Sequence, residues 1–178
     1  MVDIIKVSTR GGSGMRKIVV VIAAFVSGVV SVGYIISRFV IKPTVKELVK
    51  TREMSCKHNE LYMLMNDWVR LKQKNKNLSE YFEKHGYNKI AIYGMNYVGK
   101  ALCEELNNSK VEIVSGIDKN ATSIESDVKI CLPDDFDEKV DAIVVTPIAY
   151  FDEIADSMEN RVDCPIISIE DIVYELSE

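Results

Sequence analysis

Polar and apolar positions divide the chain into three segments. Residues 18–37 are twenty consecutive residues without a charged side chain. Residues 43–86 are mostly polar, with apolar positions at helical spacing. From residue 87 onward, short apolar runs alternate with amphipathic stretches. The pattern predicts an apolar helix, then a helical connector, then an α/β domain.

The first segment has the length and flanks of a membrane span. Twenty helical residues cover roughly 30 Å, about the hydrocarbon thickness of a bilayer, and Arg16, Lys17 and Arg38 bracket the run. A cleavable signal peptide has a shorter apolar region followed by a small-residue cleavage site, and a buried soluble helix is a further alternative. We predict a single uncleaved transmembrane anchor over residues 15–42, in contact with the membrane through residues 18–37. More basic residues follow the run than precede it, which places the C-terminal domain in the cytoplasm.

The residues before this anchor have a different character. Met15 followed by two basic residues and an apolar run is typical of a natural start, whereas Gly11-Gly12-Ser13-Gly14 is typical of a linker. We predict that residues 1–14 are a disordered or artificial extension.

The connector at residues 43–86 is predicted to be helical. Pro43 suits the first turn of a helix, and neither Gly nor Pro follows it before Gly86. One apolar set has clear helical spacing: Leu61, Leu64, Met65, Trp68 and Leu71. The helix over residues 44–77 either forms a homo-oligomer, binds a partner enzyme, or packs on its own domain. The polar residues 72–77 predict a break before a short helix that ends near Gly86.

The C-terminal part is predicted to be a small Rossmann-like parallel sheet with flanking helices over residues 87–178. The expected strands are 89–93, 111–117, 128–131, 141–146 and 165–169, and the expected helices follow the first, fourth and fifth of them. Near-continuous apolar strands joined by short connections indicate a parallel sheet covered on both faces. Right-handed crossovers then place a ligand crevice at the carboxyl ends of the strands.

The turn after the first strand resembles a dinucleotide-binding fingerprint. Gly94 and Gly99 have the expected spacing, but Asn96 stands where G-x-G-x-x-G has its middle glycine. Asparagine tolerates left-handed conformations and can donate a hydrogen bond to phosphate. We predict a cofactor-binding turn made of Gly94, Met95, Asn96, Tyr97, Val98 and Gly99. The alternative is that both glycines serve only the packing of strand and helix.

Four further residues are predicted to complete this site. Asp118, at the end of the second strand, is placed to accept hydrogen bonds from ribose hydroxyls, unless it is only a turn residue before Asn120. With no arginine in that loop, NAD or a nucleotide-sugar fits better than NADP. Lys119, Thr146 and Pro147 lie at the same predicted edge.

Charge and residue types limit the possible functions. Residues 1–77 have 14 basic against 5 acidic side chains, and residues 78–178 have 8 against 22. An acidic domain repels a phosphate backbone, so no nucleic-acid partner is expected. The four cysteines show no metal-ligand spacing and are predicted to be free thiols of a reducing compartment. No Tyr-x-x-x-Lys pair follows the fourth strand, and no other catalytic set is recognisable.

Several segments resemble small Rossmann-like proteins and domains encoded in bacterial capsule and exopolysaccharide gene clusters. These segments are residues 68–74, 78–82, 89–95, 116–120 and 169–176. The βαβ part is also similar to the first Rossmann-like module of membrane-bound nucleotide-sugar dehydratases and to the N-terminal domain of sugar O-acyltransferases. Those relatives usually have glycine in place of Asn96, and their catalytic residues lie in other domains.

The resemblance implies a membrane-anchored protein of surface-polysaccharide biosynthesis. Such a protein would bind a nucleotide or nucleotide-sugar, or recruit a partner enzyme. One alternative is a subunit of an NAD-dependent sugar-nucleotide oxidoreductase or epimerase. A purely structural scaffold with an empty crevice is the other.

Overall fold

The structure is a computed structural model that describes residues 12–178. The chain forms two compact units, the first ending at Met54 and the second running from Ser55 to Glu178. Most of the predicted N-terminal extension lies outside the described residues. Its last three residues, 12–14, begin the first helix.

The first unit is helical throughout its described part. Helix α1 (Gly12–Ile36) passes through one π-helical turn, η1 (Ser37–Ile41), into α2 (Lys42–Gln73). The backbone N–H of Lys42 donates to the carbonyl of Ser37, five residues back. Pro43, the next residue, has no backbone N–H to donate to the preceding turn, so one hydrogen bond of the helix is missing there.

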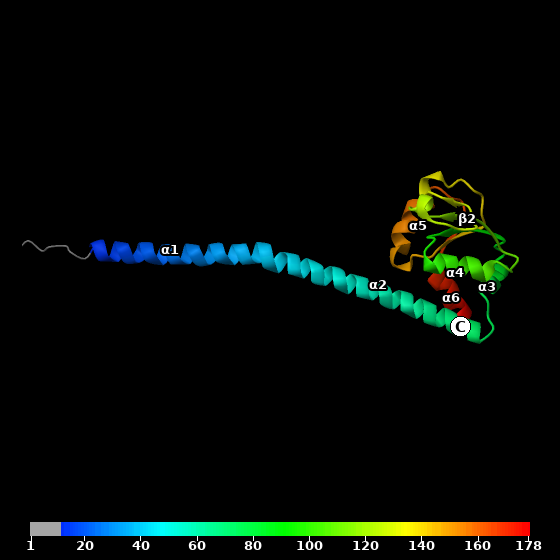
Figure 1. The fold of residues 1–178 in the computed structure, drawn as a ribbon, viewed down its shortest axis with the longest axis horizontal. Helices are drawn as coiled ribbons and strands as arrows, with labels where there is room; N and C mark the ends of the chain where they lie inside the picture. Colours follow the sequence, from blue (N-terminus) through cyan, green and yellow to red (C-terminus); the bar gives the residue numbers. More distant parts are fainter. Residues whose placement is uncertain (1–11) are drawn as a thin grey trace, which may run out of the picture. The chain divides into compact units, whose positions relative to one another are not determined.

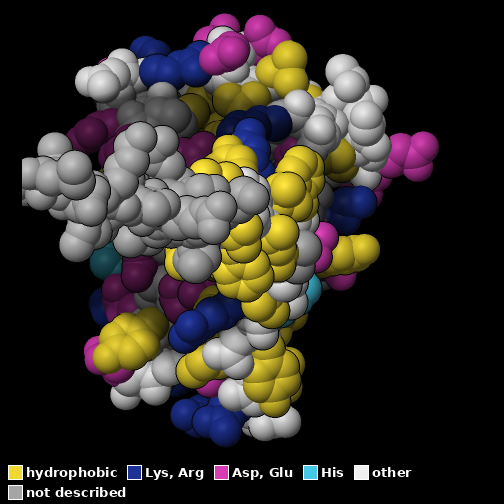
Figure 2. Space-filling model, turned by 90° about the vertical axis from the view of Figure 1, so that its left-hand side faces the viewer, with side chains coloured by type: hydrophobic (Ala, Val, Ile, Leu, Met, Phe, Trp, Pro, Cys, Tyr) yellow, Lys and Arg dark blue, Asp and Glu magenta, His cyan; other side chains and the backbone are white. Residues whose placement is uncertain are grey.

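One helical stretch within the described residues, Val20–Gln73, is long and apolar enough to cross a membrane. Its apolar window is not buried inside the protein, and Val21, Phe25 and Val30 are more than half exposed. Hydrophobic side chains also stand at the surface in Figure 2. The finding is compatible with an anchor. A signal sequence or the core helix of a soluble protein meets the same criteria of length and composition, so the stretch is a possible span.

The second unit contains the predicted parallel sheet. Its strands are β1 (Lys89–Tyr93), β2 (Glu112–Ile117), β3 (Ile130–Cys131), β4 (Ala142–Val145) and β5 (Ile166–Ser168). They lie in the order β3-β2-β1-β4-β5, and every neighbouring pair is parallel. The α/β class with flanking helices is therefore confirmed (Figure 1).

Besides the sheet and the end of α2, this unit contains four helices: α3 (Ser79–His85), α4 (Tyr97–Leu106), α5 (Phe151–Glu159) and α6 (Ile169–Ser177). Three 3-10 turns complete the connections: η2 (Ala121–Ser123), η3 (Pro133–Asp135) and η4 (Ile148–Tyr150). The predicted helix at 148–158 thus begins as the turn η4. The connections before and after β3 contain 3-10 turns in place of crossover helices.

The sheet has a hydrophobic cluster on each face. Ile90, Ile92, Ala142 and Val144 belong to the larger cluster, together with side chains of α2, α3, α4 and α6. Alternate residues point the other way, so Ala91, Tyr93, Ile143 and Val145 join Ile154 and Met158 of α5 in the second cluster. The short strands are therefore covered on both sides, as their near-continuous apolar sequences predict.

A β-bulge in β2 changes which face its side chains occupy. Ile90 pairs with Ile113, but the next residue, Ala91, pairs with Ser115, so Val114 is the extra residue. Residues 113 and 117 would share a face in a regular strand. Here Ile113 packs against the larger cluster and Ile117 belongs to the second one. The bulge therefore lets one strand contribute to both cores.

The apolar set of the connector packs on its own domain. Leu64, Trp68 and Leu71 are buried in the larger cluster, and Leu61 and Met65 pack against it. Of the possibilities named for this helix, packing on its own domain is the one that the structure shows for these residues. The residues of α2 that remain exposed in this unit include Tyr62, Met63 and Val69.

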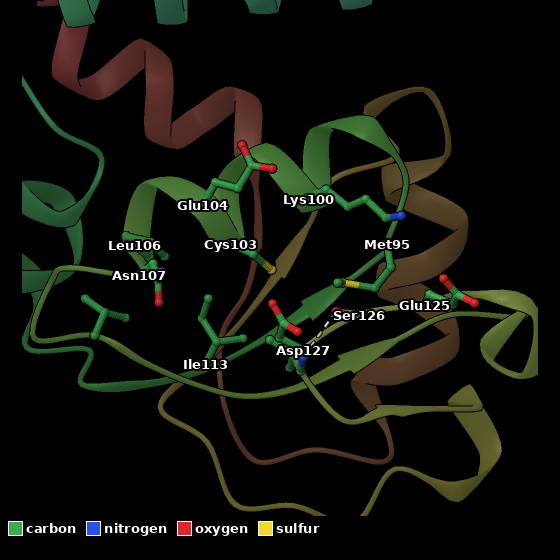
Figure 3. A pocket seen from close by; sticks show the side chains of 12 residues that line it. Met95, Lys100, Cys103, Glu104, Leu106, Asn107, Ile113, Glu125, Ser126 and Asp127 are labelled. Carbon is green, nitrogen blue, oxygen red and sulfur yellow. Dashed lines mark hydrogen bonds between the residues drawn. The ribbon is translucent and has the colours of Figure 1, made fainter.

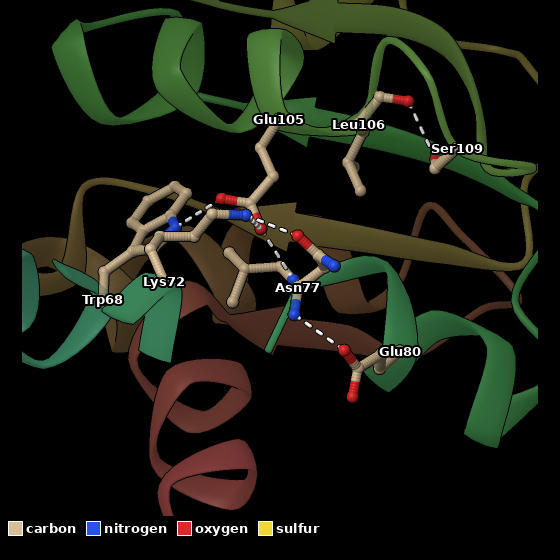
Figure 4. Close-up of polar contacts among 8 residues, drawn as sticks. Trp68, Lys72, Asn77, Glu80, Glu105, Leu106 and Ser109 are labelled. Atoms are coloured by element: carbon tan, nitrogen blue, oxygen red, sulfur yellow. Dashed lines mark hydrogen bonds and ion pairs between the residues drawn. The ribbon is translucent and has the colours of Figure 1, made fainter. Parts of the chain in front are cut away.

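Glu105 of α4 fastens the end of α2 to the domain (Figure 4). Its carboxylate accepts hydrogen bonds from Trp68 Nε1 at 2.6 Å, from Lys72 Nζ at 3.1 Å and from the backbone N–H of Leu78 at 2.7 Å. The Glu105 side chain is only 9% exposed. One carboxylate thus joins the last turns of α2, the loop after it and α4.

Glu105→Gln is expected to lower the free energy of unfolding by about 1–3 kcal/mol, because an amide NH₂ would face a donor in place of a carboxylate oxygen. Urea unfolding followed by the fluorescence of Trp68, the only tryptophan, measures the change. Glu104→Gln, at the exposed neighbouring position of α4, should stay within about 0.5 kcal/mol of the parent. Equal stability of the two variants would show that Glu105 does not fasten α2.

Candidate functional site

The turn between β1 and α4 is held in place by glycine geometry. Gly94 has φ +92°, in the left-handed region that favours glycine. A Cβ at Gly94 would overlap the side chains of Pro147 and Thr146, and one at Gly99 would overlap the carbonyl of Gly94. Both glycines are therefore required by packing alone.

Asn96 is the N-cap of α4. Its Oδ1 accepts hydrogen bonds from the backbone N–H groups of Val98 at 2.9 Å and Gly99 at 3.2 Å. These amides belong to the first turn of the helix, whose N–H groups have no acceptor inside the helix. In phosphate-binding folds the same N–H groups face the anion. In this chain the asparagine side chain satisfies them.

Asp118 supplies a second internal acceptor to the same turn. Its Oδ2 accepts from the backbone N–H of Met95 at 2.9 Å, and its Oδ1 accepts from that of Asn120 at 2.8 Å. The N–H of Gly94 donates to the carbonyl of Ile117 at 2.8 Å. The carboxylate predicted to hold ribose is thus bonded to the turn itself, and it places a negative charge beside it.

Thr146 and Pro147 close the turn from the β4 side. The buried Thr146 hydroxyl donates to the carbonyl of Gly94, at 2.6 Å, with the Tyr93 carbonyl at 3.2 Å, and Pro147 packs over Gly94. β1 and β4 are adjacent strands whose connections leave toward opposite faces, which is where an open α/β sheet has its crevice. At this point the chain's own side chains fill the space.

The structure brings most of the predicted site residues together. Residues 94–99, Asp118, Thr146 and Pro147 meet at the carboxyl edge of the sheet, as the topology predicts. Lys119 instead faces Glu153 of α5, with 4.0 Å between Nζ and Oε1. Tyr97, at the first position of α4, is 91% exposed and has no place in the turn's hydrogen bonding.

Met95 points away from the turn into a cleft beside α4, which we call the α4-side cleft (Figure 3). The cleft has a volume of about 400 Å³ and lies between α4 and the loop at 125–128. Leu106, Val111 and Ile113 form part of its apolar lining, and Lys100, Glu104, Glu125 and Asp127 stand among its polar residues. It occupies the side of the sheet where the β2–β3 connection has only the turn η2.

A second cleft, the α5-side cleft, lies at the carboxyl ends of β1 and β3. It has a volume of about 420 Å³ and is lined by Tyr93, Lys119, Leu132, Pro133, Asp134, Glu153, Ile154, Ser157 and Arg161. Burial raises the pKa of the Tyr93 phenol, and the carboxylates of Asp118, Glu153 and Asp134 raise it further, against a smaller opposite effect of Arg161. The phenol therefore stays protonated at neutral pH.

Of this cleft, the sequence pattern predicts only Lys119 as a site residue. Tyr93 is the last residue of a predicted strand, and Arg161 lies in a loop more than sixty residues later with no motif around it. The one local signal was a tyrosine as the last residue of a strand that precedes the glycine turn.

Among the residues that the structure describes, neither a metal site nor a reactive thiol nucleophile is found. No group of three His, Cys, Asp or Glu side chains in this part of the chain can hold a metal ion. Cys103, Cys131 and Cys164 are partly buried free thiols, and burial is the main cause that raises the pKa of each. Raised pKa values keep these sulfurs in the less reactive thiol form.

Comparison with known proteins gives one match. A family model described as C2185-like, N-terminal, matches residues 86–167, slightly under half of the chain. The match begins directly after α3 and extends into β5, so it covers most of the α/β fold. No curated protein and no solved structure matches the chain.

Asn96→Ala is expected to lower the free energy of unfolding by about 1 kcal/mol, because two amides of α4 lose their acceptor. Asn96→Gly should cost only a few tenths, since glycine is itself a good N-cap residue. Urea unfolding of both variants measures the difference. Asn107→Ala, at the exposed other end of α4, is the matched control. Identical losses for alanine and glycine would contradict the capping role.

Proposed function

We propose that the chain is a single-pass protein of the bacterial cytoplasmic membrane that recruits a partner enzyme of surface-polysaccharide biosynthesis. The Rossmann-like domain would lie in the cytoplasm, with residues 18–37 in the bilayer. Capsule and exopolysaccharide assembly is the pathway suggested by the resemblance of residues 61–178.

The sequence supports the membrane part of the proposal. The uncharged run has basic residues on both sides, and more of them on the C-terminal side, which favours a cytoplasmic domain. The free cysteines suit a reducing compartment. The helical stretch from Val20 has the length and composition that the proposal needs.

The closed turn after β1 is the observation on which the recruiting role rests. Asn96, Asp118 and Thr146 satisfy polar groups of that turn, and Pro147 fills the space above Gly94. A phosphate at this position would have to displace a carboxylate and an amide oxygen. In related folds this edge of the sheet binds cofactors, but here it is better suited to a structural role. The domain is therefore better suited to binding a partner protein.

The connector offers a surface for that partner or for a second copy of the chain. Tyr62, Met63 and Val69 of α2 are exposed, whereas the opposite side of the helix is buried in the domain. The Glu105 hydrogen bonds hold this part of α2 in place. A helix that is fixed on one side and presents exposed apolar side chains among polar ones on the other is suited to protein contacts.

Deletion of the gene in the native bacterium is expected to reduce surface polysaccharide, and the full chain should restore it. A variant without residues 12–41 should appear in the soluble fraction and fail to restore it. Replacing residues 18–37 by an unrelated span of equal length is the control, and should restore it.

Mass spectrometry of the membrane-bound chain should show that residues 18–37 are retained, which separates an anchor from a signal peptide. Unchanged polysaccharide after deletion, or full restoration by the variant without residues 12–41, would refute the proposal.

Nucleotide or nucleotide-sugar binding is the second candidate, and a subunit of an NAD-dependent oxidoreductase or epimerase is a special case of it. The observation that favours it is the meeting of the glycine turn, Asp118 and Thr146 at one edge of a parallel sheet. A ligand would have to take over the hydrogen bonds that these residues now make to one another.

Thermal unfolding of the full chain with NAD, NADP, UDP-sugars and coenzyme A distinguishes the candidates. A ligand at 100 times its dissociation constant stabilises by about 2.7 kcal/mol, which Trp68 fluorescence can follow. The recruiting role predicts no shift. If a nucleotide does raise the melting temperature, Asp118→Ala should abolish that shift, and a persisting shift would exclude Asp118 as the ribose ligand.

A further inference from the structure

A tyrosine hydroxyl in the wall of the α5-side cleft has no hydrogen-bond partner among the described residues. Tyr93 is only 4% exposed, and its ring belongs to the second hydrophobic cluster. Tyr93 lines the cleft, and its hydroxyl is accessible, since it is not among the buried polar atoms that lack a partner. A protonated phenol at the wall of a cavity is a donor that is available to a ligand.

The charges around this hydroxyl are largely compensated within the protein. Arg161 donates through Nη1 to the Asp134 carboxylate at 2.8 Å and through Nη2 to the Asp134 carbonyl at 3.0 Å. Lys119 faces Glu153. With Asp118 also close enough to influence Tyr93, three carboxylates stand against two cations. This balance disfavours an anionic ligand such as a phosphate.

The lining of the cleft as a whole suits a neutral polyhydroxylated molecule. The carboxylates of Glu153 and Asp134 can accept from hydroxyls, and Tyr93 can donate to one. Leu132, Pro133 and Ile154 supply apolar contacts for C–H groups. The volume of about 420 Å³ falls in the lower part of the range for small-molecule sites, which is roughly 300–1,000 Å³.

We propose that the α5-side cleft binds a neutral pyranose sugar unit, with Tyr93 donating a hydrogen bond to one of its oxygens and Glu153 accepting from one of its hydroxyls. The inference rests on the proposed function, because it gives the domain a contact with the saccharide that the recruited enzyme would process. It differs from nucleotide binding at the glycine turn, since none of residues 94–99 lines this cleft.

The test is saturation-transfer NMR on the full chain in lipid nanodiscs, with methyl glycosides of neutral hexoses and N-acetylhexosamines as probes. Alkyl maltosides must be avoided because their headgroup is itself a sugar. At least one glycoside should show saturation transfer. Tyr93→Phe, which removes only the hydroxyl, should weaken its binding about two- to tenfold, the equivalent of one hydrogen bond.

Tyr81→Phe is the matched control, because Tyr81 is also a buried tyrosine but belongs to the cluster on the other face of the sheet. It should leave glycoside binding unchanged. Glu153→Gln is the second test variant, at an exposed position that does not endanger folding, and should also weaken binding.

Three results would overturn the proposal. These are no saturation transfer to any glycoside, binding that neither Tyr93→Phe nor Glu153→Gln alters, and tighter binding of hexose 1-phosphates than of the neutral glycosides. The deletion experiment separates this inference from the proposed function. A chain that restores polysaccharide without binding glycosides refutes only the sugar site, and a chain that binds glycosides without restoring polysaccharide refutes only the recruiting role.

Discussion

The contact of Gly94 with Thr146 and Pro147 determines what the carboxyl edge of the sheet can do. It lies between β1 and β4, the two central strands whose connections leave toward opposite faces. In an open sheet this divergence creates a crevice. Here the Thr146 hydroxyl bonds the Gly94 carbonyl, and the proline ring occupies the space that the missing Cβ of glycine leaves. This contact therefore fills the space between the two diverging connections.

Closing the centre leaves open space on the two flanks of the sheet. The β2–β3 and β3–β4 connections have only the short turns η2 and η3, so neither end of β3 is covered by a crossover helix. The α4-side cleft lies beside the first connection, and the α5-side cleft lies beside the second. These two volumes thus follow from short connections, and apart from Met95 none of residues 94–99 lines either of them.

Local sequence patterns predicted the elements well, and they predicted side-chain partners poorly. The bounds of β1 and the break after α2 followed from an apolar run and a polar run, which are local signals. The bulge at Val114 was not predictable, because it depends on how β2 pairs with β1. Arg161, Asp134 and Tyr93 meet only through the tertiary fold, so no spacing in the sequence indicated their cleft. The edge shared by residues 94–99, Asp118 and Thr146 was predictable because topology alone places it there.

The role of Asn96 shows why a fingerprint spacing does not by itself define a ligand. The first turn of any helix has N–H groups that need acceptors, and either a phosphate or a capping side chain can provide them. A glycine at this position leaves the amides open to a ligand. Asparagine brings its own oxygen to Val98 and Gly99, and Asp118 does the same for Met95. The residue that departs from the fingerprint is thus one of two whose side-chain oxygens accept hydrogen bonds from amides of the turn. The glycines around it are still required by packing.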